Sequence, residues 1–174
     1  ATAFQVSGNY FDVVRVPMAL GRGLVESDDA PSAAPAAVIS HAYWRQRFGS
    51  DPKVMGGTYR MNNTPVTIVG VTAASYNGII RLDDKPPDIT IPIAHGPTLN
   101  PSDSKRMTDG TSYWVLMAGR LKPGVTFDQV TGNLGGPFEA SIRQGSDEYA
   151  AALTPAEREL SRNKKERTQV PSLF

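Results

Sequence analysis

The sequence predicts a mixed α+β domain, because strand-like and helix-like runs follow one another along the chain. Several short runs are apolar or alternate in polarity, as strands do, and others repeat apolar residues every three to four positions, as helices do. This order, with several strands close together in sequence, is typical of α+β folds with antiparallel pairing. Glycine and proline make up 30 of the 174 residues, above the usual share of about 12%, so we expect many turns between short elements.

The first 35 residues are predicted to hold one strand, one helical turn and two loops. Thr2–Val6 alternates enough for a strand. Asn9 can cap a helical turn over Tyr10–Val14, since its side chain accepts from unpaired N–H groups at a helix start. Two loops are expected on composition, one from Pro17 through Gly21-Arg22-Gly23 and a mobile one over Asp28–Pro35.

A buried strand and a well-capped helix are expected next. Ala36–Ile39 is a short apolar run that predicts the strand. Ser40 follows it as an N-cap, and the helix should end at Gly49, which suits the left-handed position after a helix. Trp44 and Phe48 are four residues apart and should share one helix face.

A β-hairpin and one further strand complete the predicted first part of the chain. Gly57–Met61 and Val66–Val71 read as two strands joined through 62–65, where asparagine tolerates positive φ. Asp88–Ile93 predicts a strand whose isoleucines share a face, and its Pro92 indicates an edge or terminal position. The polar stretch His95–Gly110 is expected to be a loop or linker.

The last third predicts a strand followed by helices. Ser112–Leu121 is the most strand-like run of the chain, and Lys122-Pro123-Gly124 predicts a turn after it. Thr126 should cap a helix that Gly135-Gly136-Pro137 ought to kink or split. Its apolar stripe is Phe127, Val130, Leu134, Phe138 and Ile142, and Thr154-Pro155-Ala156-Glu157 predicts a capping box for a further, highly charged helix.

Composition excludes several classes of function. Lys and Arg number 18 against 17 Asp and Glu, so there is no basic excess of the kind that nucleic-acid binding requires. The chain has no cysteine, which excludes disulfides and thiolate chemistry. The best apolar run, Val66–Ala74, is half the length of a membrane span. Strand-like residues at both ends, Thr2–Val6 and Val170–Phe174, suggest a piece of a longer protein.

No motif indicates a catalytic, cofactor or metal site. Histidine occurs only at His41 and His95, and we expect both to be solvated or capping. Ser40 is next to His41, but neighbouring helical side chains diverge and no nucleophile-elbow motif is present. The pairs Asp28-Asp29 and Asp83-Asp84, the run Gly21-Arg22-Gly23 and the pair Gly56-Gly57 lack metal-binding or phosphate-binding spacing, and are interpreted as turns.

An ordered series of short motifs resembles a known family. The motifs are Val6–Val14, Leu20–Gly23, Ala37–Ser40, Trp44–Gly49, Asp51-Pro52, Val66–Val71, Pro87–Ile93 and Gly119–Thr126. Together these motifs resemble the periplasmic core domain of MacB-like ABC transporter permeases, in the FtsX-like superfamily, and most of all the branch of duplicated orphan permeases.

The resemblance implies a domain organisation. Residues 1–110 would form a strand-rich, sabre-like part with one helix. Residues 111–145 would form the strand and helix that return to a porter-like α/β part, and 146–174 would add a helical tail and the start of a strand.

The resemblance also implies a function without catalysis or cofactor. The domain would lie outside the cytoplasmic membrane and couple movement of the parent permease's transmembrane helices to an exported substrate or periplasmic protein. The intact permease would work as a dimer. One alternative is a module that recruits a lipoprotein or cell-wall enzyme through the loops at 28–35 and 95–110. A remote alternative is a hydrolase using His41 or His95 with a loop aspartate.

Overall fold

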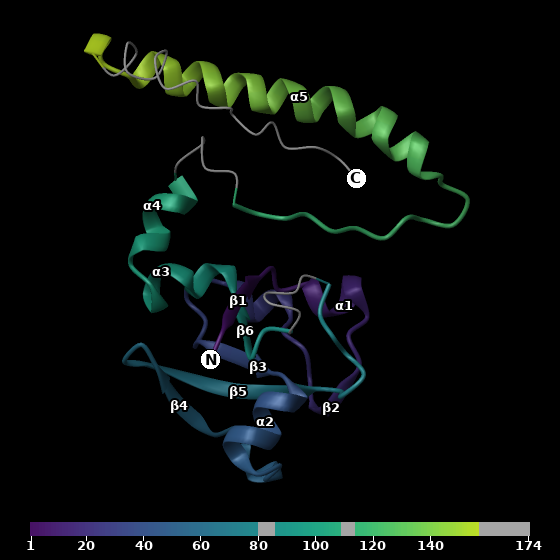
Figure 1. Cartoon of the computed structure of the whole chain (residues 1–174), viewed down its shortest axis with the longest axis vertical. Coiled ribbons are helices and arrows are strands. Elements are labelled where there is room, and N and C mark those ends of the chain that lie inside the picture. The colour runs from purple at the N-terminus through teal and green to yellow at the C-terminus, as the bar shows by residue number, and fades with distance from the viewer. Residues whose placement is uncertain (80–85, 109–113, 157–174) are drawn as a thin grey trace. The chain divides into compact units, whose positions relative to one another are not determined.

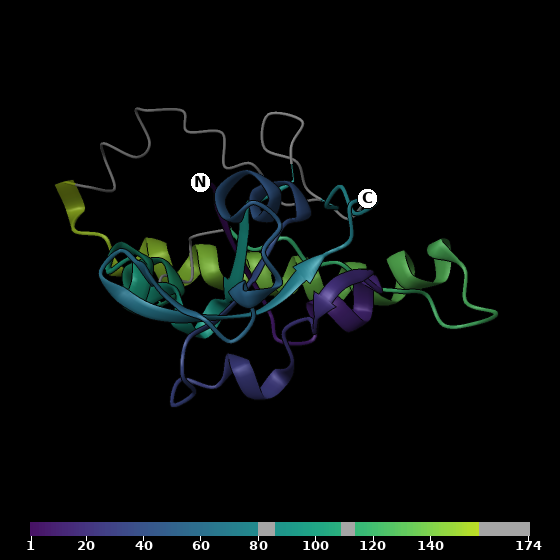
Figure 2. The same cartoon turned by 90° about the horizontal axis from the view of Figure 1, so that it is seen from below.

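The computed structural model describes residues 1–79, 86–108 and 114–156. The chain divides into two compact units, unit 1 from Ala1 to Ser104 and unit 2 from Lys105 to Phe174. Unit 1 holds a six-stranded mixed sheet with helices, and unit 2 contains one long helix (Figures 1 and 2). The predicted α+β class is confirmed.

The sheet is built around strand β5, which is the longest. Its order is β1-β6-β3-β5-β2, and β4 pairs with the first part of β5. β1 runs parallel to β6 and β3 runs parallel to β5, whereas the other pairs are antiparallel. The strands are β1 (Ala3–Val6), β2 (Met18–Gly21), β3 (Ala36–Ile39), β4 (Thr58–Met61), β5 (Thr64–Thr72) and β6 (Ile89–Pro92).

Strand β3 forms the centre of unit 1, as its wholly apolar sequence predicts. All four of its residues are buried, and successive side chains point to opposite faces of the sheet. Ala36 and Val38 pack against helix α1 (Tyr10–Val14) and its surroundings. Ile39, on the other face, packs in the cluster that helix α2 (His41–Phe48) covers. The sheet is therefore covered on both faces.

Helix α2 has both of the ends that the sequence predicts. The Ser40 hydroxyl accepts a hydrogen bond from the Tyr43 backbone N–H at 3.1 Å, and Gly49 ends the helix with a φ of 58°. Trp44 and Phe48 both pack against the same cluster beneath the helix. The predicted cap of α1 is wrong, because the Asn9 side chain accepts from the Ser7 hydroxyl and caps no helical N–H group.

The predicted hairpin is confirmed, with a tighter turn than expected. β4 and β5 pair from Met61↔Thr64 outward, so only two residues separate the strands. These residues, Asn62 and Asn63, have φ values of 46° and 68°. Positive φ at both central positions matches the twist of the two strands, and asparagine tolerates it better than most residues.

Strand β6 lies inside the sheet, between β1 and β3. Pro92 is its last residue, which is the terminal position that the sequence allowed. The predicted loop over His95–Gly110 is wrong for the described residues. The chain forms a 3₁₀ turn over Ile93–His95, then the helices α3 (Gly96–Leu99) and α4 (Ser102–Thr108).

Two other predicted loops contain regular structure. Met18–Gly21 forms β2, because it pairs with the far half of β5, although Pro17 and Gly21 indicated a loop. Glu26–Asp29 forms a 3₁₀ turn at the start of the stretch that we predicted to be mobile. A second 3₁₀ turn over Pro52–Val54 connects α2 to the hairpin.

Unit 2 differs from its prediction in two elements, the strand before the turn and the helix after it. Residues 114–121 form no strand, and 112–113 lie outside the described part. The predicted turn is present, since Val125 N–H donates to the Lys122 carbonyl at 3.1 Å and Gly124 has a φ of 80°. Helix α5 (Phe127–Ala152) follows, with the predicted Thr126 cap paired reciprocally with Gln129.

The expected split of α5 is also wrong, because the helix continues through Pro137. Proline removes one hydrogen bond from a helix, but a long helix can tolerate that loss. The predicted capping box at 154–157, the charged helix after it, and the pair Asp83-Asp84 lie wholly or partly outside the described residues.

Candidate functional site

The residues considered for catalysis have structural roles. Ser40 caps α2, and the His41 ring lies edge-on to Trp44 with centroids 5.5 Å apart. His95 is 3% exposed, and its Nε2 lies 3.1 Å from the Asp28 carbonyl oxygen. The prediction of a solvated or capping histidine is therefore wrong for His95. The structure brings no serine hydroxyl into a described hydrogen bond with either ring.

The acidic pair Asp28-Asp29 joins segments that are far apart in sequence. Asp28 forms a two-pronged pair with the Arg22 guanidinium, at 2.6 and 2.9 Å, and accepts from the Val25 N–H. Asp29 accepts from Gly8 N–H at 3.0 Å and Ala94 N–H at 2.9 Å. The pair is therefore a structural junction, and the sequence indicated only a turn.

Acid should weaken this junction. The hydrogen bonds from Arg22 hold the pKa of Asp28 below its usual range, against a smaller opposing effect of burial. A lowered pKa stabilises the fold above the unfolded value of about 4, and that contribution is lost as pH falls through the folded value. We expect the thermal midpoint of Arg22→Gln to fall less between pH 6 and pH 3 than that of the parent chain. Arg47→Gln, an exposed control, should keep the parent slope.

The start of helix α4, the last element of unit 1, is held by a buried polar contact. Asp103 is 5% exposed and accepts from Gln5 Nε2 of β1 at 2.5 Å and from Asn100 Nδ2 at 3.2 Å. Just before it, Leu99 is buried among side chains of the sheet, and its carbonyl accepts from Asn62 Nδ2 at 3.0 Å. The start of the connection toward unit 2 is thus fastened to both β1 and the hairpin.

Exposed apolar side chains are concentrated in unit 2. In the segment before α5, Val115 and Leu116 are 55% and 54% exposed, and Met117 is 77% exposed. On α5, Phe127 and Leu134 of the predicted stripe are about half exposed. Contiguous apolar exposure of this kind usually marks a surface that another element or protein covers.

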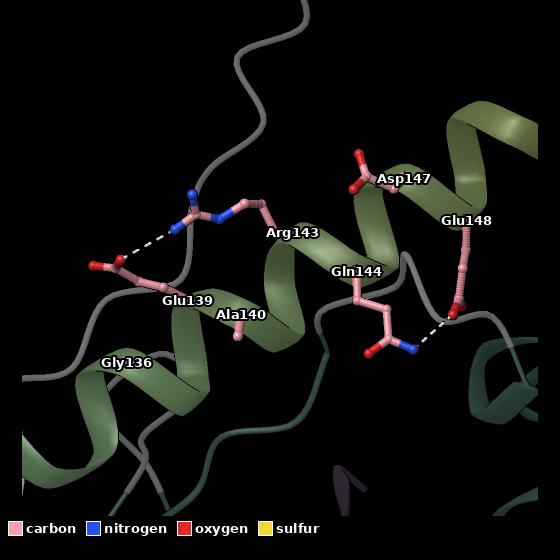
Figure 3. Close-up of a pocket in the computed structure, with 7 residues that line it drawn as sticks. All are labelled: Gly136, Glu139, Ala140, Arg143, Gln144, Asp147 and Glu148. Carbon is pink, nitrogen blue, oxygen red and sulfur yellow. Dashed lines mark hydrogen bonds and ion pairs between the residues drawn. The ribbon is translucent and has the colours of Figure 1, made fainter.

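A shallow hollow lies along α5 (Figure 3). Its lining residues all belong to this one helix, and the side chains point outward rather than toward a common centre. Arg143 pairs with Glu139 at 3.6 Å, and Gln144 donates to Glu148 at 2.9 Å. These are the four-residue contacts that stabilise an exposed helix, so the hollow indicates no enclosed ligand site.

The described residues hold neither a cluster of metal ligands nor a membrane-spanning helix. Within residues 1–79, 86–108 and 114–156, histidine and acidic side chains nowhere gather in threes as metal ligands would. In the same ranges, no helix has both the length and the hydropathy to cross a membrane.

Comparison with known proteins gives a consistent class. The chain is 36% identical over 77 residues to a probable syringafactin export ATP-binding/permease protein of Pseudomonas syringae, covering 44% of this chain and 12% of the relative. It is 33% identical over 72 residues to a probable export ATP-binding/permease protein MacB of Pseudomonas entomophila, covering 41% and 11%. These matches thus span about a tenth of each relative.

A solved structure shares the fold. The periplasmic region of MacB from Actinobacillus actinomycetemcomitans superposes with a TM-score of 0.56 at 14% identity, covering 87% of this chain and 66% of that one. The fold is therefore that of the periplasmic region of MacB. The sequence profile of the MacB-like periplasmic core domain matches residues 1–135, and the chain belongs to that family. The resemblance seen in the motifs is confirmed, and family membership implies an extracytoplasmic placement.

Proposed function

We propose that this chain is a non-catalytic, mechanotransmitting domain of a membrane permease. In this proposal the parent's transmembrane helices move unit 2, and unit 1 passes the movement to a substrate or partner. The observation that carries the proposal is the fastening of α4, because Asp103 ties the start of the connecting helix to β1. A connection held at a buried residue transmits displacement, whereas a slack linker absorbs it.

The proposal keeps the domain assignment that the resemblance implies. Residues 1–110 are the sabre-like part, 111–145 return to the porter-like part, and 146–174 form a tail. The run at 114–121 supports this assignment, because Val115, Leu116 and Met117 are exposed in the chain alone. In the intact permease, this run would pair with a strand of the porter-like part.

Site-specific labels give a direct test in the intact permease. This chain has no cysteine, so once any cysteine elsewhere in the parent is replaced by serine, Gln46→Cys and Gly132→Cys carry the labels, one on an exposed surface of each unit. A membrane-impermeant maleimide should label both from the periplasmic side. Spin labels at the two positions should report a change in separation when ATP is hydrolysed.

Asp103, which ties α4 to β1, is the residue to replace in this test. Asp103→Ala should leave labelling intact and broaden or abolish the ATP-dependent change, because α4 loses its tie to β1. Asp12→Ala removes an exposed carboxylate elsewhere in unit 1 and should change neither readout. An unchanged separation under turnover, in a permease that still hydrolyses ATP, would contradict mechanotransmission.

A second candidate function is recruitment of a periplasmic protein, which the exposed apolar side chains of unit 2 favour. The predicted contact loops support it less, since Asp28, Asp29 and His95 hold unit 1 together. Photo-crosslinkers at Met117 and at Gln46 distinguish the two functions. Recruitment requires one specific adduct at Met117 that is absent at Gln46, and no adduct at Met117 would exclude it.

A further inference from the structure

Positive charge in unit 1 gathers on one short stretch of sequence. Residues 41–63 carry four Lys and Arg against one acidic residue, Asp51, whereas the rest of residues 1–104 carries four against eight. The stretch covers α2, the 3₁₀ turn after it and β4. Figure 1 shows α2 beside the β4–β5 hairpin. The stretch from α2 to β4 is therefore a basic part of an otherwise acidic unit.

Three cations on this side are available to a ligand. Arg45, Arg47 and Lys53 are exposed, and none forms an ion pair with another described residue. The nearby acidic residue does not neutralise them through a contact, because Asp51 Oδ1 accepts from the Lys53 backbone N–H at 2.9 Å. The two arginines lie in the last turn of α2 and complement its dipole. That role leaves their guanidinium hydrogen bonds free.

Two amphipathic aromatic rings lie among these cations. Trp44 is half-buried and donates its indole N–H to the Asp51 carbonyl at 2.9 Å. Tyr59 is 38% exposed, with its ring edge-on to Phe48 at 5.1 Å. These contacts fix both rings within the fold. Trp and Tyr mixed with Lys and Arg are typical of surfaces at a lipid headgroup layer.

We propose that this α2 surface, formed by Trp44, Arg45, Arg47, Lys53 and Tyr59, binds the headgroups of an anionic phospholipid bilayer. A protein hot spot would need an aromatic anchor that inserts into a partner's pocket, whereas exposed cations around fixed rings suit a planar anionic layer. Each cation near such a layer strengthens binding about fivefold, so three give roughly 100-fold over a neutral bilayer.

The inference rests on the proposed function in one respect. A domain tethered to a membrane protein meets the bilayer at high effective concentration, so modest intrinsic affinity is enough for docking. Docking of the α2 surface would hold unit 1 in one orientation relative to the membrane. ATP-driven movement would then either release the α2 surface from the bilayer or move unit 2 while unit 1 stays docked.

Vesicle binding tests the proposal on the whole 174-residue chain. We expect cosedimentation with vesicles of phosphatidylethanolamine containing about 30% phosphatidylglycerol, and at least tenfold weaker binding to pure phosphatidylcholine. Raising NaCl from about 0.1 to about 0.5 M should abolish most of the binding, because salt screens exposed charges. The triple variant Arg45→Gln, Arg47→Gln, Lys53→Gln should lose at least tenfold while still unfolding cooperatively, with a thermal midpoint only slightly lowered by the loss of the two charges that complement the helix dipole.

A matched control removes the same charge elsewhere. Arg15→Gln, Lys122→Gln, Arg143→Gln neutralises three exposed cations and should bind within about twofold of the parent chain. Equal losses in the two triple variants, or no preference for anionic vesicles, would overturn the proposal. Tighter binding of soluble poly-glutamate than of the anionic vesicles would also overturn it, in favour of an acidic protein partner. Docking would reduce maleimide access at Gln46, which lies between Arg45 and Arg47, but the change in spin-label separation on ATP hydrolysis does not depend on vesicle binding, so the proposed function is judged separately by that change.

Discussion

Replacing Gly70 by alanine is expected to destabilise unit 1 by about 3 kcal/mol. Gly70 lies in β5 and pairs with Gly21, the last residue of β2. A Cβ built on Gly70 would lie 2.0 Å from the carbonyl oxygen of Arg22, the next residue along the chain from Gly21. The clash is with backbone, and the Arg22 N–H already donates to the Val69 carbonyl at 3.0 Å. Neither strand can therefore yield without losing pairing. Thermal unfolding, followed through Trp44 in a Trp114→Phe background, measures the loss.

Gly49→Ala is the matched control for this prediction. Gly49 has a φ of 58°, and its added Cβ would meet nothing within 4 Å. The substitution costs only the strain of a left-handed residue, about 1 kcal/mol. A loss at Gly70 no larger than the loss at Gly49 would mean that β2 and β5 do not approach as closely as described.

Elements with local determinants could be predicted from the sequence. Helix α2 has its stop and start signals within one residue of each end, at Ser40 and Gly49. The hairpin carries its own turn chemistry at Asn62 and Asn63. Helix α5 begins at a capping box and keeps one apolar stripe. In each case, the residues that determine the element lie within it or next to it.

Elements that depend on distant partners could not be predicted. β2 is a strand because Met18 and Leu20 pair with Thr72 and Val71, some fifty residues away in the chain. Conversely, the run at 114–121 has high strand propensity, but in the described part of the chain it forms no strand. Propensity describes the fit of a side chain to a sheet, and the sheet itself must come from elsewhere.

The candidate sites follow the same division. Composition correctly identified Asp28-Asp29 as a notable pair, but a turn was the only role that local sequence could suggest. Its partner Ala94 lies 65 residues away from Asp29, and buried His95 stands next to that partner. The α2 surface was visible only as scattered arginines. Its charge asymmetry becomes meaningful once contacts of Trp44 with Asp51 and of Phe48 with Tyr59 join α2, the turn after it and β4.

Asp29→Ala is expected to be the most damaging loss of a polar side chain in unit 1, at about 3 kcal/mol. The carboxylate accepts one backbone N–H on each oxygen, from Gly8 ahead of α1 and from Ala94 after β6. Alanine leaves both donors without a partner, and the Gly8 backbone is buried against Val25 and Glu26. Urea unfolding at pH 7 gives the free energy directly.

Two further variants separate geometry from charge. Asp29→Asn keeps one amide oxygen as an acceptor but turns an NH₂ group toward the second backbone N–H, so it should recover at most about half of the loss. Glu26→Ala removes an exposed carboxylate from the same 3₁₀ turn and should change stability by less than about 0.5 kcal/mol. If Asp29→Ala were as mild as Glu26→Ala, residues 26–29 would not be the junction between α1 and the segment after β6. Acid sensitivity centred on Arg22 and Asp28 would then need another origin, because both effects depend on the same turn holding its place.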